Sequence, residues 1–312
     1  MLPFRLKSFL KVVIWGGDAI AAFKGIPAQS HAICESWEVS AMPGAQSLID
    51  SGELAGMALG DACARFAEKL LGKRIVDTFG TDFPILIKLI DAARDLSIQV
   101  HPDDSIAARY HSSRGKSEMW YIIDRKPGAR IIPGLKRSLT VAEFDRHLRN
   151  GTIMDDVAVC ETHPGDVFYL PTGRIHAAGA GNFILEVQQA SDITYRIHDY
   201  GRLGSDGRPR QLHHDMARIA VDLQALDDYR HPTDGCLLID TPNFRVEKAT
   251  LAPERLLHIS HDAFAIIFPL DHQVTVAAAN ETLEIPKGHS CFIPANIDTD
   301  VSGEGDVLLI TV

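Results

Sequence analysis

The sequence has few cysteines, and their pattern is that of unpaired thiols. Five of its 312 residues are cysteine, at Cys34, Cys63, Cys160, Cys236 and Cys291. Their number is odd, their spacing is irregular, and no two of them form a Cys-x-x-Cys pair. These features argue against a disulfide framework and against a cysteine-rich zinc site. We therefore expect a cytoplasmic protein.

The chain also lacks a long uninterrupted hydrophobic run. The apolar stretch at residues 4–15 is broken by Arg5, Lys7 and Lys11. This pattern is typical neither of a membrane span nor of the core of a secretory signal. We expect no membrane partner.

The chain has fewer positively charged than negatively charged residues. The chain has 31 Lys and Arg against 41 Asp and Glu, a formal net charge of -10. Such a balance disfavours nucleic acid and anionic membranes as main partners. An anionic substrate would need a local basic cluster that acts against the field of the remaining protein.

Short β-branched or alternating runs, bounded by Pro-Gly or Gly-Asp turns, predict a mainly β fold with a few helices. The expected strands cover residues 97–101, 118–123, 166–170, 183–188, 264–268, 274–278 and 307–312. Helices are expected at residues 61–71, 140–149 and 212–223. The second helix has a Thr-x-x-Glu capping box at Thr140 and Glu143 and ends at Asn150-Gly151.

A faint internal repeat suggests two related β-barrels. Pro164-Gly165-Asp166 leads through an apolar run to Pro171, and Pro286-Lys287-Gly288 leads through a similar run to Pro294. Only the first copy continues to a histidine, so only the first barrel is expected to hold a metal. The turn sequence at residues 231–235 marks a boundary. We predict a catalytic metal-binding domain at 1–230, with helical insertions, and a small barrel without metal at 235–312.

Two histidines and a carboxylate stand out as candidate metal ligands. On a strand, Gln99 and His101 point to the same face, and the apolar residues between and before them point to the other. Glu118 is an acid in a core-like strand, which is costly unless it is paired or bound to a metal. His176 follows a Pro-x-Gly turn. Together they suit Zn²⁺ or another divalent ion, although histidines in β proteins are often structural, hydrogen-bonded residues.

A set of segments, in order over nearly the whole chain, resembles one family. They are Ile14-Trp15-Gly16-Gly17, Glu35-Ser36-Trp37-Glu38, Ile87-Lys88, Gln99-Val100-His101-Pro102-Asp103-Asp104, Gly115-Lys116-Ser117-Glu118-Met119-Trp120-Tyr121, Pro171-Thr172-Gly173-Arg174-Ile175-His176-Ala177, and Ser191-Asp192 through Tyr195-Arg196. The ordered set resembles a type I phosphomannose isomerase of the short bacterial form, in the cupin superfamily. The resemblance implies two cupin barrels, each a double-stranded β-helix or jelly roll.

The resemblance also implies a ligand set and an activity. Gln99, His101, Glu118 and His176 match the ligands of one Zn²⁺ per chain, although the Gln99 amide could instead bind substrate or water. The implied reaction interconverts D-mannose 6-phosphate and D-fructose 6-phosphate. The partner is then a small sugar phosphate, and we expect a monomer or weak homo-oligomer.

The remaining site residues follow from the resemblance and from the chemistry. Arg196 matches the family's active-site arginine, Lys116 resembles the family lysine implicated in substrate binding, and Lys88 lies in a matching apolar strand. We expect Arg196 and Lys116 to act in catalysis and, with Lys88, to bind the substrate. Aldose-ketose isomerisation needs a stabilised enediolate and a group that moves a proton between two carbons. Glu186 and Asp192 are candidates for that group, alongside a metal-bound water and a ligand histidine.

Two other functions remain open from the sequence. Two histidines and a carboxylate are also the metal set of Fe(II) oxygenases, and a cupin can become a non-catalytic sugar-phosphate-binding module. The basic residues Lys116 and Arg196 beside the metal set favour the isomerase over the oxygenase. The complete set of matched positions favours an enzyme over a binding module.

Overall fold

The computed structural model describes residues 1–27, 33–204 and 207–312, except for the side chains of residues 13–15. The side chains of Ile14 and Trp15, which belong to the first matching segment, therefore lie outside the described residues. The fold is mainly β, as predicted, and every strand pair in the described residues is antiparallel.

A six-stranded sheet and two small sheets carry the first half of the fold. The six-stranded sheet has the order β10 (Val167–Leu170), β7 (Glu118–Arg125), β12 (Asn182–Gln189), β5 (Ile85–Ala92), β3 (Ile33–Val39) and β2 (Phe9–Gly17). The small sheets are β11 (Ala177–Ala178), β8 (Arg130–Ile132) and β9 (Cys160–Glu161), and β13 (Tyr195–His198) with β6 (Ile98–Val100). All expected strands before residue 200 lie in these sheets.

The later strands form a seven-stranded and a four-stranded sheet. The seven-stranded sheet has the order β14 (Leu237–Asp240), β15 (Arg245–Leu251), β22 (Gly305–Thr311), β17 (Ala265–Pro269), β20 (Ser290–Ile293), β1 (Phe4–Lys7) and β4 (Leu48–Ile49). The four-stranded sheet has the order β16 (Leu257–Ile259), β21 (Thr299–Gly303), β18 (Val274–Ala278) and β19 (Glu281–Ile285). Strand β1 thus joins a sheet built mostly from the end of the chain.

One hydrophobic core is shared by the two larger sheets. It contains Ile87 and Val187 of the six-stranded sheet together with Phe4, Phe292 and Leu308 of the seven-stranded sheet, all buried. A separate core fills the space between the seven- and four-stranded sheets. The division into domains at 1–230 and 235–312 stays a prediction, and any such division must separate β1 from its partner β20 and divide the shared core.

The predicted helices form with changed bounds. The helix expected at 61–71 is two helices, α2 (Leu59–Phe66) and α3 (Glu68–Leu71), because Ala67 adopts a φ of 38° that a right-handed helix cannot continue. Helix α6 (Val141–Asn150) has the predicted capping box between Thr140 and Glu143 and ends at left-handed Gly151. Helix α7 (His214–Ala220) is shorter than the expected 212–223, because Val221 is already extended.

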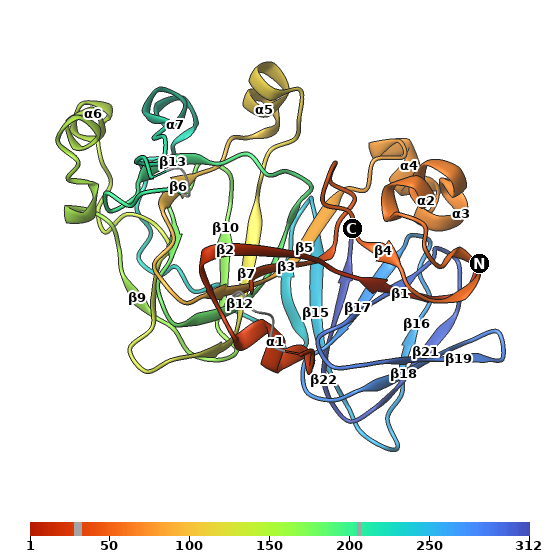
Figure 1. The fold of residues 1–312 in the computed structure, drawn as a ribbon. Coiled ribbons are helices and arrows are strands. Elements are labelled where there is room, and N and C mark those ends of the chain that lie inside the picture. The colour runs from red at the N-terminus through yellow and green to blue at the C-terminus, as the bar shows by residue number, and fades with distance from the viewer. Residues whose placement is uncertain (28–32, 205–206) are drawn as a thin grey trace.

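Three helices were not expected from the sequence: α1 (Ala19–Lys24), α4 (Lys73–Phe79) and α5 (Asp104–His111). Figure 1 shows α5, α6 and α7 on one side of the molecule, near β6 and β13, and shows α2, α3 and α4 grouped beside β4. Among the described residues, no helix is long and apolar enough to cross a membrane.

The two repeat segments have a similar local structure. Gly165 and Gly288 both have positive φ, at 92° and 71°, and each turn leads into a buried strand, β10 or β20. Within the described residues, only one group of His, Cys, Asp and Glu side chains is close enough to hold a metal, and it belongs to the first half of the chain. The two-barrel interpretation itself stays a prediction.

Candidate functional site

Backbone pairing brings the two candidate histidines together. His101 directly follows β6, and His176 directly precedes β11. Gln99 and His176 exchange two backbone hydrogen bonds of 3.0 Å, and the Gly173 amide donates to the His101 carbonyl at 2.9 Å. Glu118, the first residue of β7, approaches from the six-stranded sheet.

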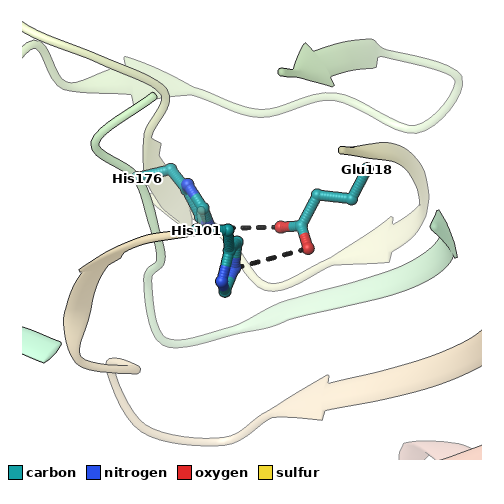
Figure 2. A group of neighbouring side chains, drawn as sticks. All are labelled: His101, Glu118 and His176. Atoms are coloured by element: carbon teal, nitrogen blue, oxygen red, sulfur yellow. Dashed lines mark ion pairs between the residues drawn. The ribbon is translucent and has the colours of Figure 1, made fainter. Parts of the chain in front are cut away.

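The three side chains point toward one another in a buried cluster (Figure 2). Each is at most 1% exposed. His176 Nε2 lies 3.1 Å from Glu118 Oε1, and His101 Nε2 lies 3.6 Å from Glu118 Oε2. Their candidate ligand atoms all lie within 4.8 Å of one another. One ion could therefore contact all three.

Both histidines turn their Nε2 atoms toward the cluster because Nδ1 is already bonded. His101 Nδ1 donates to the Ile193 carbonyl at 2.7 Å, and His176 Nδ1 donates to the Arg174 carbonyl at 2.8 Å. In a neutral ring with the proton on Nδ1, Nε2 is a lone pair. This is the tautomer that a metal requires.

A lone pair of His176 thus faces an oxygen of Glu118 with no proton between them. Glu118 Oε1 is buried and accepts no hydrogen bond from the described residues. Two acceptors 3.1 Å apart repel unless a cation lies beside both. The donor set of two imidazoles and one carboxylate therefore fits a divalent metal of the zinc type.

Electrostatics favour the ionisation states that a metal needs. Burial lowers the pKa of His101 well below its usual value, and the nearby Lys116 ammonium adds to this effect. Burial raises the pKa of Glu118, but the Lys116 ammonium outweighs it and holds this pKa well below its usual range. Lys116 contacts both residues: its Nζ pairs with Glu118 Oε2 and lies 3.1 Å from His101 Nε2.

Gln99 lies at the cluster, with its amide nitrogen toward the metal position. Its Nε2 is 3.4 Å from Nε2 of both His101 and His176, and its Oε1 accepts a 3.5 Å hydrogen bond from Ser97. Only the amide oxygen could bind a metal. Ligation by Gln99 therefore requires the amide to turn, and its role stays a prediction.

A cavity of about 370 Å³ opens beside this cluster. Gln99, Lys116 and the ring of Trp120 form part of its wall. Six of its lining residues are cationic, although the chain as a whole is acidic: Lys11, Lys88, Lys116, Arg196, Arg202 and Arg210. Three are carboxylates: Glu35, Glu186 and Asp192. The cavity is thus the local basic cluster expected for an anionic substrate.

Comparison with known proteins identifies the family. Residues 3–127 match the model of the phosphomannose isomerase type I catalytic domain. Mannose-6-phosphate isomerase ManA of Bacillus subtilis is 38% identical over 301 residues, which cover 94% of this chain and 93% of that protein. The chain belongs to the type I phosphomannose isomerase family.

Other members agree in length and fold. The mannose-6-phosphate isomerase of Streptococcus mutans is 30% identical, over 95% of this chain and 93% of its own. The crystal structure of the mannose 6-phosphate isomerase from Bacillus subtilis superposes with a TM-score of 0.89 at 30% identity, over 100% of both chains. Phosphomannose isomerase from Salmonella typhimurium shares the fold, with a TM-score of 0.81 at 18% identity over 99% of both chains.

In this family member, the predicted substrate and catalytic residues line the same cavity. Arg196 lies opposite Gln99 on paired strands β13 and β6. Its guanidinium donates to Ser97 Oγ at 3.3 Å and to the Gln211 carbonyl at 2.8 Å. Within the described residues it forms no ion pair, with Asp192 and Asp199 included.

Lys88 and Glu186 form a buried ion pair in the cavity wall. Lys88 Nζ is 3.1 Å from Glu186 Oε1, and Trp120 Nε1 donates to Glu186 Oε2 at 2.8 Å. Burial lowers the pKa of Lys88, but Glu186 and Glu35 outweigh it and raise this pKa above its usual value. The neighbouring carboxylates thus favour the charged form of Lys88. Glu186 contacts Lys88 and Trp120, and neither His101 nor Arg196.

Sequence reasoning missed four charged residues of the cavity: Lys11, Glu35, Arg202 and Arg210. Arg202 and Arg210 both pair with the buried carboxylate of Asp199, and Lys11 lies 3.8 Å from Glu35 Oε2 and 3.9 Å from Asp192. Glu35 stands in a segment that was recognised as a family motif, which is the one signal that could have found it. The other three are cations on segments without a sequence pattern.

Proposed function

We propose that this chain interconverts D-mannose 6-phosphate and D-fructose 6-phosphate, with one Zn²⁺ held by His101, Glu118 and His176 and with Gln99 beside it. The observation that carries the proposal is the buried cluster, in which two imidazole lone pairs and a carboxylate converge at a basic cavity. Membership of the isomerase family supports the reaction.

The metal would supply a positive charge that lowers the cost of the enediolate oxygens. The chain adds fixed cations to the same wall. Lys88 and Lys116 are held by Glu186 and Glu118, so they are oriented before substrate arrives and need no reorganisation during the reaction. Arg196 donates to Ser97 and to the Gln211 backbone and forms no ion pair within the described residues, which leaves its charge suited to bind a substrate oxyanion.

The substrate phosphate needs several cations in a chain of net charge -10. We assign substrate binding to Lys88, Lys116 and Arg196, and Arg202 and Arg210 add two guanidinium groups to the same cavity. Guanidinium groups suit phosphate because their planar forks can donate two parallel hydrogen bonds.

We retain two carboxylates of the cavity wall as candidates to carry the proton between the substrate carbons. Glu186 is buried and bonded to Lys88 and Trp120, whereas Asp192 is half-exposed at the cavity and lies 3.9 Å from Lys11. Comparing Glu186→Gln with Asp192→Asn decides between them. The variant that loses exchange of the substrate C2 hydrogen with solvent, while it still binds substrate, identifies the proton carrier.

We propose a cytoplasmic setting, because all five cysteines are free and three of them are buried. The net charge of -10 supports the absence of a nucleic-acid partner. For the oligomeric state we retain a monomer or weak homo-oligomer, which sedimentation at several protein concentrations would test.

A coupled assay for fructose 6-phosphate formation tests the function, run with and without a chelator. We expect turnover that the chelator abolishes and Zn²⁺ restores. His176→Gln should lose activity and bound metal together. His258→Gln is the matched control, because His258 is an exposed histidine paired with Asp300 at 2.8 Å. Activity in metal-free protein, or oxygen consumption in place of isomerisation, would overturn the proposal.

A further inference from the structure

The segment that follows α7 packs against the loop that carries His176. We call residues 221–231 the strap. The Asp222 amide donates to the Gly173 carbonyl at 2.8 Å. Gly173 has a φ of +84°, and a Cβ at this position would lie 3.0 Å from the Ala220 carbonyl oxygen and 3.1 Å from the Asp222 nitrogen. The strap therefore follows the loop at 171–176 so closely that a side chain at position 173 would not fit without a shift.

A second contact joins the strap to the loop through side chains. The Arg174 guanidinium lies 5.3 Å from the centroid of the Tyr229 ring. Arg174 is only 8% exposed, its Nε is buried without a hydrogen-bond partner, and it forms no ion pair within the described parts of the chain. Burying a guanidinium is costly unless something compensates for lost hydration. The aromatic face of Tyr229 is the compensating partner seen here.

Tyr229 is itself fixed in the protein. Its hydroxyl donates to the Leu135 carbonyl at 2.6 Å and accepts from the Leu226 amide at 3.1 Å. Gly134 lies so near the ring that a Cβ there would be 2.2 Å from it. The ring therefore cannot move with Arg174. It is a rigid surface on which the Arg174 side chain rests.

Arg174 also supplies the partner of a candidate metal ligand. Its backbone carbonyl accepts the Nδ1 proton of His176 at 2.8 Å. That hydrogen bond sets both the tautomer and the ring orientation of His176. We propose that Arg174 is a positioning residue: its side chain, stacked on Tyr229 of the strap, holds its own carbonyl in place to orient His176 toward the metal. This inference rests on the proposed metal site.

Metal binding, measured apart from catalysis, tests the inference. Arg174→Met keeps the length and apolar body of the side chain and removes the guanidinium. Loss of a group that orients a ligand typically weakens metal affinity by about 10- to 100-fold. We expect a loss in that range for Zn²⁺, measured by competition with a chromophoric chelator, together with faster metal release from the loaded protein and a changed absorption spectrum of the Co²⁺ form.

Arg230→Met is the matched control. Arg230 is the next strap residue after Tyr229 and also lies over an aromatic ring, at 5.9 Å from the Phe168 centroid, but its guanidinium pairs with Asp166 and donates to the Glu161 carbonyl. It should keep wild-type metal affinity. Tyr229→Leu removes the stacking surface from the strap side and should weaken metal binding as Arg174→Met does.

Three results are distinguishable. Wild-type protein that binds no metal would overturn the proposed function. Wild-type metal affinity in folded Arg174→Met, or equal losses in Arg174→Met and Arg230→Met, would overturn the positioning role and leave the proposed function intact. If Arg174→Met does not fold, Tyr229→Leu and the conservative Arg174→Lys carry the test. Unchanged affinity in both of these would refute the inference.

Discussion

Replacing Arg196 by alanine should separate catalysis from folding. The Arg196 side chain makes two hydrogen bonds, to Ser97 Oγ and to the Gln211 carbonyl, and both are at least partly open to solvent. At about 1 kcal/mol each, their loss should lower the free energy of unfolding by about 1 to 2 kcal/mol. The strand itself should persist, because the Arg196 amide donates to His213 Nδ1 and the Arg196 carbonyl accepts from the His213 amide, and neither bond involves the Arg196 side chain.

Turnover should fall far more than stability. If the guanidinium stabilises the enediolate oxyanion, its loss should cost about 3 to 4 kcal/mol in the transition state, so kcat should fall by roughly two to three orders of magnitude. KM should change little. Metal content should stay at the wild-type level, because the Arg196 side chain bonds to Ser97 and Gln211 and to none of the three proposed metal ligands.

Steady-state kinetics, metal analysis and urea unfolding of the same preparation provide the assay. A rise in KM with kcat nearly intact would instead show that Arg196 binds the phosphate equally in the ground and transition states. Arg196→Lys keeps the charge and loses the planar fork, so partial recovery of kcat would assign the effect to charge. Wild-type kcat and KM in Arg196→Ala would refute its part in the mechanism.

Three further predictions follow from the site. Metal analysis of the purified protein should find about one divalent ion per chain, bound at His101, Glu118 and His176, and a structure with an ion in the C-terminal sheets would contradict this. Glu186→Gln should lower the free energy of unfolding in urea, because it breaks the buried pair with Lys88. Breaking a buried pair typically costs about 3 to 5 kcal/mol, and we expect somewhat less here because the Glu35 carboxylate still faces Lys88. An unchanged midpoint of urea unfolding would contradict this prediction. Burial raises the pKa of Glu35, but Lys88 and Lys11 outweigh it and lower this pKa below 4.5. The ionised Glu35 therefore stabilises the fold above pH 4.5, and this contribution is lost as the pH falls through the lowered pKa. The stability difference between wild type and Glu35→Gln should therefore shrink as the pH falls below 4.5, and a difference that stays constant with pH would refute it.

The local patterns that could be predicted from the sequence are those that depend on neighbouring residues. The capping box at Thr140 formed as expected because both partners lie within one helical turn. Strand β18 matches its expected bounds at 274–278 because alternation alone specifies it. The break at Ala67 was not predictable, because no glycine or proline marks it. The early end of α7 reflects a contact with Gly173, which is distant in the sequence.

The same limit applies to the site. The residue types His101, Glu118 and His176 pointed to a metal, and the structure brings them together. The carbonyl partners of the two histidines could not be inferred, because a backbone carbonyl leaves no signature in a sequence. The pairing of Lys88 with Glu186 could not be inferred either, because Asp91 and Asp95 are acids closer to Lys88 in the sequence. The pair forms because the register between strands β5 and β12 places Lys88 opposite Glu186.

The position of β1 has a consequence for how the chain folds. Phe4 lies opposite Phe292, and β1 separates β20 from β4 in the seven-stranded sheet. During synthesis, therefore, β1 leaves the ribosome long before its partner β20 and stays unpaired with it until that strand has been made. Contacts so distant in sequence form slowly and leave apolar strand edges open in the meantime. We expect the closing of this sheet to be a late step in refolding, and intermediates before that step to be the species most prone to aggregate.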